Sequence, residues 1–227
     1  MRDPDPFDNP IHAALSTLHR DIALRAGGAA RYPAEVAPFF AVEDPATDAT
    51  DAVAALVAPG ESVYLLGVAP ATVRGATLHA FDKLAQMVCD APLDDVDGPD
   101  VQPLDATHRD DVLALTALVY PHYFRPRTMD MGRYFGIYEN GRLAAMIGER
   151  LGSRTAREIS AVCTHPDFNG RGYARRLMAF LTNDLLARNV RPFLHVSHEN
   201  ARAKTMYERI GFRAAPDIGF WSLRRDD

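Results

Sequence analysis

A glycine-containing turn at residues 169–174 is the part of this sequence best suited to binding an anion. It reads Asn169, Gly170, Arg171, Gly172, Tyr173, Ala174. If a helix follows, its first backbone N–H groups have no partner inside the helix and lie at the positive end of its dipole. Glycine beside them lets an anion approach the backbone closely. The turn therefore predicts a phosphate site, with a purely geometric use of glycine as the alternative.

A strand before the turn and a helix after it have to hold it in place. Residues 158–164 read as the strand, and apolar residues recur at helical spacing over residues 174–185. Residues 193–197 read as the next strand. Because a helix joins the two strands, we expect them to be parallel neighbours in one sheet. A last helix starts after Asn200, which is a plausible cap, and residues 219–223 read as a last strand.

The alternation of side chains along the first of these strands predicts which residues share a face. With a period of two, one face carries Glu158, Ser160, Val162 and Thr164. Cys163 is then expected on the opposite face. That position argues against a reaction through an acyl-cysteine.

The sequence before the turn predicts further strands and a domain boundary. Asn140-Gly141 between two apolar runs is a strong signal for a β-hairpin, because both turn residues need positive φ. The acidic segment Asp90–Asp100 contains two prolines and no apolar run, so it predicts a linker. We expect an N-terminal accessory α/β domain over residues 1–98 and a second domain over residues 99–227.

The composition fits a globular chain and excludes several classes of protein. Of 227 residues, 47% are hydrophobic, and the net charge of −5 gives no basic surface suited to nucleic acid. Cys89 and Cys163 have no C-x-x-C partner, so no structural metal is expected. No apolar run approaches the ~20 residues that span a bilayer. We expect a soluble cytoplasmic protein, a monomer or homodimer, without membrane or nucleic-acid partners.

Several spaced elements together resemble the GNAT superfamily of acyl-CoA-dependent N-acyltransferases. The elements are Val162-Cys163-Thr164-His165-Pro166-Asp167, then Asn169-x-x-Gly172-x-Ala174, then Asn200, and then Tyr207-Glu208-Arg209-Ile210-Gly211-Phe212. The resemblance covers residues 101–227. It implies an α/β fold with a central mixed sheet flanked by helices, and residues 1–98 look similar to the degenerate extra half of some members.

The resemblance implies which residues bind acetyl-CoA. The turn from Asn169 to Ala174 would donate backbone N–H groups to the diphosphate, although the family motif begins with Gln or Arg where this chain has Asn169. The backbone of Val162, Cys163 and Thr164 would bind the pantetheine as an added strand does. The family separates this strand from the next parallel one, and the cofactor fills the gap. Asn200 matches a residue that contacts the cofactor.

The resemblance also implies two catalytic residues, each with an alternative role. Tyr207 matches the tyrosine that protonates the departing CoA thiolate, although it also fits a core position. Glu158 lies where some members carry a glutamate base, and it would accept the amine proton directly or through water. Its alternative is an ion pair with Arg150 or Arg157. His195 follows on the parallel strand and could face the substrate.

The reaction implied is direct transfer of an acetyl group from acetyl-CoA to a primary amine of a small molecule, amino acid or peptide. The aromatic segment Pro121–Arg127 either lines the acceptor pocket or covers the core. Two alternatives stay open. One is a non-catalytic regulatory module that binds acyl-CoA, and the other is a different nucleotide at the glycine turn.

Overall fold

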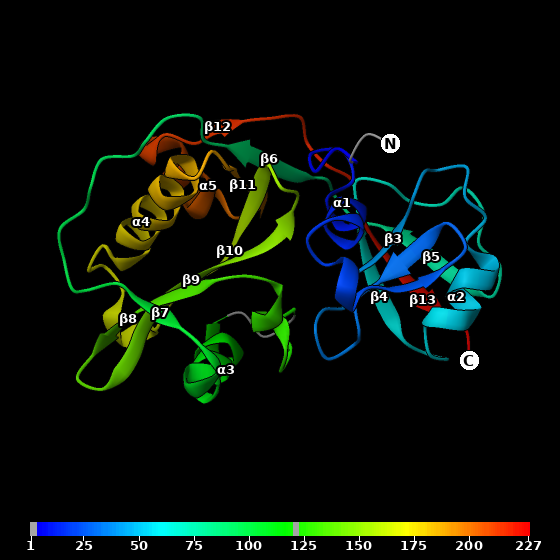
Figure 1. Cartoon of the computed structure of the whole chain (residues 1–227), viewed down its shortest axis with the longest axis horizontal. Coiled ribbons are helices and arrows are strands. Elements are labelled where there is room, and N and C mark those ends of the chain that lie inside the picture. Colours follow the sequence, from blue (N-terminus) through cyan, green and yellow to red (C-terminus); the bar gives the residue numbers. More distant parts are fainter. Residues whose placement is uncertain (1–3, 120–122) are drawn as a thin grey trace.

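The chain folds into two lobes that lie side by side (Figure 1). The computed structural model describes residues 4–119 and 123–227. Within these residues the larger lobe is built on a seven-stranded mixed sheet with the order β12-β6-β11-β10-β9-β8-β7. The smaller lobe holds two three-stranded sheets, β1-β2-β3 and β4-β13-β5. The expected mixed α/β fold with a central sheet and flanking helices is therefore confirmed.

The elements of the larger lobe are β6 (Leu84–Val88), β7 (Gln102–Leu104), α3 (Arg109–Val119), β8 (Tyr134–Glu139), β9 (Arg142–Gly152), β10 (Ala156–Thr164), α4 (Tyr173–Ala187), β11 (Arg191–Ser197), α5 (Ala201–Ile210) and β12 (Arg213–Ala214). Those of the smaller lobe are α1 (Pro10–Ser16), β1 (Leu24–Ala26), β2 (Ala29–Arg31), β3 (Phe40–Val42), α2 (Thr50–Leu56), β4 (Ser62–Leu66), β5 (Ala76–Ala80) and β13 (Phe220–Arg225). Short 3-10 turns lie at Arg20–Ile22, Ala106–His108, Thr128–Met131 and Pro166–Phe168.

Helices cover both faces of the large sheet. One face packs against α4 through a core that includes Leu177, Leu181 and Ile159. The opposite face packs against α3, where Val112 and Leu115 meet Cys163. Both cores are apolar because each helix turns one stripe of side chains toward the sheet. None of the helices in the ranges given above combines the length and apolar character needed to cross a bilayer.

The local signals in the sequence located most of these elements. The hairpin at Asn140-Gly141 is confirmed, since the two residues have φ of 50° and 74° and join β8 to β9. The parallel pairing of β10 with β11 is also confirmed. Near the N-terminus, α1 ends at Ser16, and the first strand begins at Leu24 after a short 3-10 turn.

Alternation along β10 is interrupted by a bulge, which corrects the expected faces. Between Ser160 and Cys163 the strand advances three residues while β9 advances two, from Gly148 to Met146. Ala161 sits at the irregularity with φ of 52°. Val162 therefore packs with the α4 core, as Ile159 does. The expectation that Glu158, Ser160, Val162 and Thr164 share one face is wrong for this reason.

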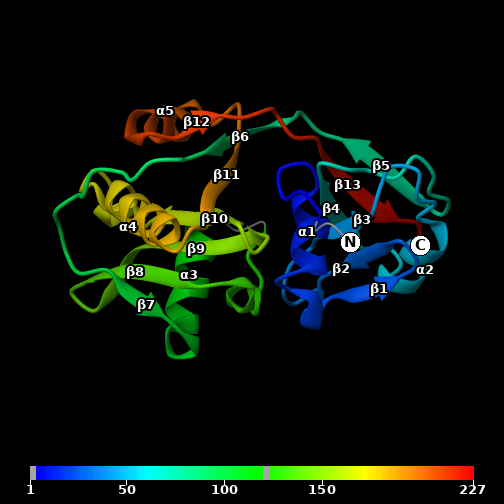
Figure 2. The same cartoon turned by 45° about the horizontal axis from the view of Figure 1, so that its top comes forward.

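Two strands cross the boundary that the linker predicts between residues 98 and 99. β6 precedes the linker but pairs with β11 in the large sheet, from Phe193↔Val88 to Ser197↔Leu84. β13 follows it but lies between β4 and β5 in the small lobe. Both crossings run close together across the top of Figure 2, and Leu84 forms a bridge with Ile218 there. The strands of the two lobes are therefore not divided at residues 98 and 99. Whether residues 1–98 and 99–227 fold as separate units stays a prediction.

Two fragments test whether the larger lobe needs β6. Residues 82–217 keep β6 and omit β13, whereas residues 99–217 lack β6 as well. Without β6, the edge of β11 from Phe193 to Ser197 loses its partner, and exposed strand edges promote aggregation. We expect the longer fragment to be monomeric with cooperative thermal unfolding by circular dichroism, and the shorter one to aggregate. Equal behaviour of the two would show that residues 99–217 fold independently of β6.

Candidate active site

A cleft of about 700 Å³ opens where β10 and β11 separate. The two strands are in parallel register only from Ala156↔Arg191 to Glu158↔Phe193. Beyond that point β10 lines the cleft from Glu158 to Cys163, and β11 with the loop after it lines the cleft from Leu194 to Asn200. The two strands are therefore unpaired along the cleft, which lies where neighbouring strands would otherwise be hydrogen-bonded.

Each of the two strands is held on its far side. β11 pairs with β6 along Phe193–Ser197, and β10 pairs with β9 as far as Thr164↔Ala145. The backbone groups of Val162, Cys163 and Thr164 that face β11 thus have no strand beside them. Such an edge can accept an extended ligand in place of a strand. This is the separation that the resemblance implied.

The glycine turn follows β10 after the short 3-10 turn at Pro166–Phe168, and it has exposed backbone N–H groups. Gly170 and Gly172 have φ of 80° and 79°, and a Cβ at either would meet no atom within 4 Å. Intrahelical bonding of α4 starts with Arg176, whose N–H reaches the Gly172 carbonyl at 3.0 Å. Among residues 4–119 and 123–227, no acceptor is bonded to the N–H groups of residues 170–175. They are free to bind an anion.

The side chains of the turn are less free than its backbone. Arg171 donates to Glu139 at 2.9 Å, and its guanidinium lies 5.0 Å from the centre of the Phe168 ring. The hydroxyl of Tyr173 also donates to Glu139. Asn169 is exposed at the start of the turn, and Ala174 is half-buried in the first turn of α4. The charge of Arg171 is therefore already balanced by a carboxylate that the sequence analysis had not connected with it.

Glu158 is the centre of a buried polar network at the floor of the cleft. Its carboxylate accepts two hydrogen bonds from Arg150, at 2.8 and 2.7 Å, and one from the Leu151 N–H at 3.2 Å. It also lies 2.7 Å from Nδ1 of His195. The other ring nitrogen of His195 lies 3.1 Å from the side-chain oxygen of Gln86. The sequence alternative of an ion pair with Arg150 is thus the observed one, while Arg157 lies beside Glu149 instead.

The network fixes the charge of Glu158. Burial alone would raise the pKa of its carboxyl, but the Arg150 charge and hydrogen bonds from Arg150 and His195 outweigh burial and hold that pKa well below its ordinary value. An ionised carboxylate already engaged by three residues is a weak proton acceptor. The geometry therefore favours an anchoring role for Glu158 over a base.

Cys163 is unsuited to nucleophilic attack for a different reason from the one expected. It lines the cleft, yet its side chain is buried in the α3 core. Burial raises the pKa of its thiol to about 12. At neutral pH the group is a neutral thiol, and the thiolate is the reactive form.

Tyr207 and Asn200 both line the cleft from α5 and the loop before it. Tyr207 is 9% exposed, and its ring lies 6.1 Å from that of Phe212. It is therefore a core residue whose surface also borders the cleft. Asn200 caps α5 by accepting the Ala203 N–H at 3.1 Å.

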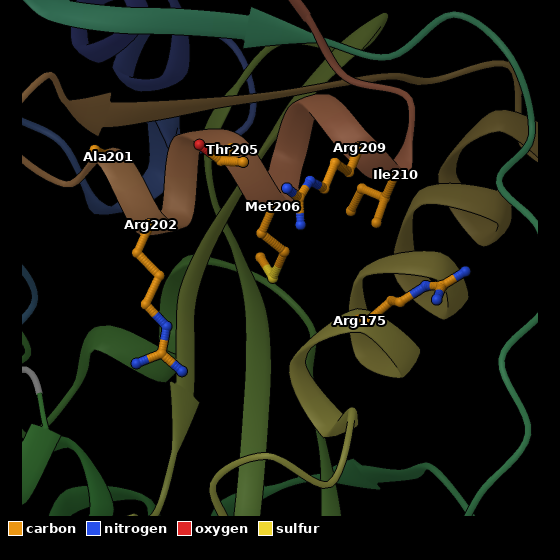
Figure 3. A pocket seen from close by; sticks show the side chains of 7 residues that line it. All are labelled: Arg175, Ala201, Arg202, Thr205, Met206, Arg209 and Ile210. Atoms are coloured by element: carbon orange, nitrogen blue, oxygen red, sulfur yellow. The ribbon is translucent and has the colours of Figure 1, made fainter.

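A second hollow lies between α4 and α5 and carries three arginines. Figure 3 shows Arg202 and Arg209 leaving α5 two turns apart, and Arg175 leaving the start of α4 across the hollow. None of the three forms an ion pair with any residue that the structure describes. The spacing of seven between Arg202 and Arg209 places them on one helix face, and this signal in the sequence could have found them.

The small lobe supplies another part of the cleft that the sequence analysis missed. Tyr64, Phe81 and Phe220 line it together with Tyr123. Of the aromatic segment Pro121–Arg127, Pro121 and His122 lie outside the described residues, and Tyr123 faces the cleft. No short-range pattern could have found Tyr64, Phe81 and Phe220, because they come from segments as far apart as β4 and β13, whereas Tyr123 belongs to the aromatic segment that the sequence offered as a pocket lining. The described residues contain no group of three or more His, Cys, Asp or Glu placed to hold a metal ion.

Known proteins resemble this chain over the same elements. Residues 134–221 match the model of the FR47-like protein family. A crystal structure from Novosphingobium aromaticivorans, assigned to the GNAT acetyltransferase family, is 30% identical with a TM-score of 0.87, covering 99% of this chain and 100% of that one. A GCN5-related N-acetyltransferase from Kribbella flavida is 16% identical with a TM-score of 0.60, covering 94% and 93%, and shares the fold. No curated protein matches the chain.

Replacing Glu158 by Gln tests its anchoring role. The change removes the charge that balances the buried Arg150. It also places an amide N–H group next to the N–H groups that donate to Glu158. We therefore expect the free energy of unfolding to fall by roughly 3 kcal/mol. Glu35→Gln is the matched control, because its ion pair with Arg127 is about half exposed and contributes little. Urea unfolding of the three proteins measures both effects. A Glu158→Gln protein as stable as the control would contradict the anchor.

The low pKa of Glu158 predicts that the stability difference between wild type and Glu158→Gln depends on pH. The pKa of Glu158 is lower in the folded protein than the value of 4.5 for a free side chain. The unfolded chain therefore binds the proton first as the pH falls, so this stabilisation is complete above about pH 4.5 and is lost below it. We expect the difference in unfolding free energy between wild type and Glu158→Gln to shrink as the pH is lowered from about 5 to 3. A constant difference would mean that the charge is not what matters.

Proposed function

The chain belongs to the GNAT family of acetyltransferases, and on this premise we propose that it transfers the acetyl group of acetyl-CoA directly to a primary amine. The observation that carries the proposal is the cleft between β10 and β11, together with the unbonded N–H groups of the glycine turn that follows β10. A long, flexible ligand with a diphosphate fits both features. The acceptor is a small molecule, an amino acid or a peptide.

Acetyl-CoA would lie along β10 and reach α4. Its pantetheine arm carries amide groups, which can bond the open backbone of Val162, Cys163 and Thr164 as a neighbouring strand would. Its diphosphate would bind the N–H groups from Gly170 to Ala174 at the positive end of the α4 dipole. The part of Asn200 that does not cap α5 borders the same cleft and would contact the arm.

The arginine hollow is placed to receive the ribose phosphate of the same ligand. CoA carries a 3′-phosphate on its adenosine, beyond the diphosphate. Arg175 lies two residues after Tyr173, where α4 begins, and the hollow extends from there to Arg202 and Arg209 on α5. These guanidinium groups have no carboxylate partner in the described part of the chain, and a phosphate would supply their counter-charge.

The reaction proposed is attack of the neutral amine nitrogen on the thioester carbonyl carbon. A backbone N–H near Val162 polarises the carbonyl oxygen, where negative charge develops. The carbon–sulfur bond then breaks, and the Tyr207 hydroxyl gives its proton to the CoA sulfur. The amine proton passes to water, because Glu158 would have to give up Arg150 or His195 to take it. Most of the rate enhancement comes from holding the two reactants together.

Binding of acetyl-CoA tests the cofactor assignment. Isothermal titration with acetyl-CoA and with acetyl-dephospho-CoA, which lacks the 3′-phosphate, should give affinities that differ by about 10-fold in the wild type. The double variant Arg202→Gln/Arg209→Gln should bind the two ligands equally. The control variant Arg20→Gln/Arg154→Gln removes the same number of charges from exposed arginines elsewhere. It should keep the difference in affinity between the two ligands. Absence of acetyl-CoA binding at millimolar concentration would end the proposal.

Tyr207→Phe tests the acid. The substitution keeps the ring that packs in the α4 core and removes only the hydroxyl. We expect kcat on an amine panel to fall roughly 100-fold, with the Kd for acetyl-CoA little changed. Release of CoA thiol measures turnover. Unchanged kcat would remove Tyr207 from the mechanism, and binding without turnover of any amine in the wild type would favour the non-catalytic acyl-CoA-binding module.

A further inference from the structure

We propose that the acceptor is a primary amine that carries an aromatic or similarly large apolar group and no carboxylate. This inference rests on the acetyl transfer proposed above and names the substrate class for the same cleft. The small lobe would supply the surface that recognises the apolar group. Two independent features of the cleft support the choice: its aromatic wall and its unbalanced charge.

The aromatic wall consists of Tyr64, Phe81, Tyr123 and Phe220, all of which line the cleft. The rings are in mutual contact: Phe81 and Phe220 stack with centres 4.9 Å apart, Tyr64 and Phe220 stack at 5.7 Å, and Tyr64 meets Tyr123 edge-on at 5.2 Å. Contacting rings of this kind form a continuous apolar surface. Another ring can pack on such a surface by stacking or by an edge contact.

The wall is open to a ligand at Phe81. This side chain is 41% exposed, although its ring already packs on Phe220 and on His79. Phe81 precedes β6, and β6 pairs with β11 on the opposite side of β11 from the cofactor gap. The wall and the gap between β10 and β11 thus border one cavity from two lobes. A ligand with its amine toward β10 can place an apolar group against the wall.

The charges in the cleft favour an ammonium group over a carboxylate. Asp82 and Glu199 line the cleft, and neither is in an ion pair within residues 4–119 and 123–227. The basic side chains there already have partners. Arg150 pairs with Glu158 at 2.7 Å, His195 contacts the same carboxylate at 2.7 Å, and His198 contacts Asp217 at 2.9 Å. An amine attracted as a cation meets Asp82 or Glu199, whereas an amino-acid carboxylate would meet no unpaired arginine or lysine among the described residues that line the cleft.

Direct binding to the CoA-loaded protein tests this without needing turnover. Isothermal titration compares 2-phenylethylamine with n-propylamine, L-phenylalanine and putrescine. We expect 2-phenylethylamine to bind about 10-fold more tightly than each of the others, since the ring gains an apolar surface and the carboxylate gains nothing. Equal affinity of 2-phenylethylamine and n-propylamine would overturn the aromatic wall as a recognition surface. Tighter binding of L-phenylalanine or putrescine would overturn the substrate class.

Phe81→Ala locates the recognition on the wall. This exposed side chain can be shortened with little effect on the fold, and we expect the preference for 2-phenylethylamine over n-propylamine to drop at least about 3-fold. Phe180→Ala is the matched control, because Phe180 is 38% exposed on α4 and packs on Phe135, away from the cleft. Equal loss of preference in both variants, or none in Phe81→Ala, would contradict the proposal.

The titration of CoA itself separates this inference from the function on which it rests. If the protein fails to bind acetyl-CoA, acetyl transfer is refuted whatever the amines do. If it binds acetyl-CoA and acetylates n-propylamine as efficiently as 2-phenylethylamine, acetyl transfer stands and only the substrate class is refuted. Turnover on the same amines, read from CoA thiol release, gives this second comparison.

Discussion

The buried carboxylate of Glu158 is the interaction on which the site depends. It stands at the last pair of residues that joins β10 to β11, Glu158↔Phe193, and the cleft begins immediately beyond it. It receives Arg150 from β9 and His195 from β11, and His195 reaches Gln86 on β6. Four strands are therefore tied together at one level of the sheet. A buried charge held this way tolerates little displacement, because any lost partner leaves an uncompensated ion.

Beyond Glu158, β10 and β11 separate, and each strand exposes backbone groups along the edge that faces the other. The strands on their outer sides stabilise this arrangement. β11 keeps its outer partner β6, and β10 keeps β9, so each strand stays rigid with one open edge. The bulge at Ala161 changes which side chains meet α4 and lets Val162 join that core. The open edge is thereby presented on a fixed support. A site built mainly from backbone groups depends on such rigidity more than on particular side chains.

Local patterns in the sequence were enough for the turns and the strand order around the cleft, but not for the contacts across it. Asn140-Gly141 and the turn at Gly170–Gly172 specify their own geometry through positive φ, so sequence alone located them. Glu158 is different, since its partners Arg150 and His195 lie on separate strands. The residues next to Glu158 in the sequence do not indicate which side chains it contacts. The bulge was missed for a related reason: it arises from the register of β10 against β9, which no single strand encodes.

The two chain crossings between the lobes position the aromatic wall relative to the cleft between β10 and β11. β6 pairs with β11 from Phe193 to Ser197, and Phe81 and Asp82 lie three and two residues before the start of β6 at Leu84. Phe220 opens β13 two residues after Ile218, and Ile218 exchanges backbone hydrogen bonds with Leu84 at 2.9 and 3.0 Å. The wall is therefore attached through a few residues of extended chain to the strand that borders the gap. The acidic segment Asp90–Asp100 does not join the lobes, because it runs from β6 to β7 within the large sheet. The lobes are joined by the two bonded crossings, so the positions of Phe81 and Phe220 relative to β11 are set by the sheet itself.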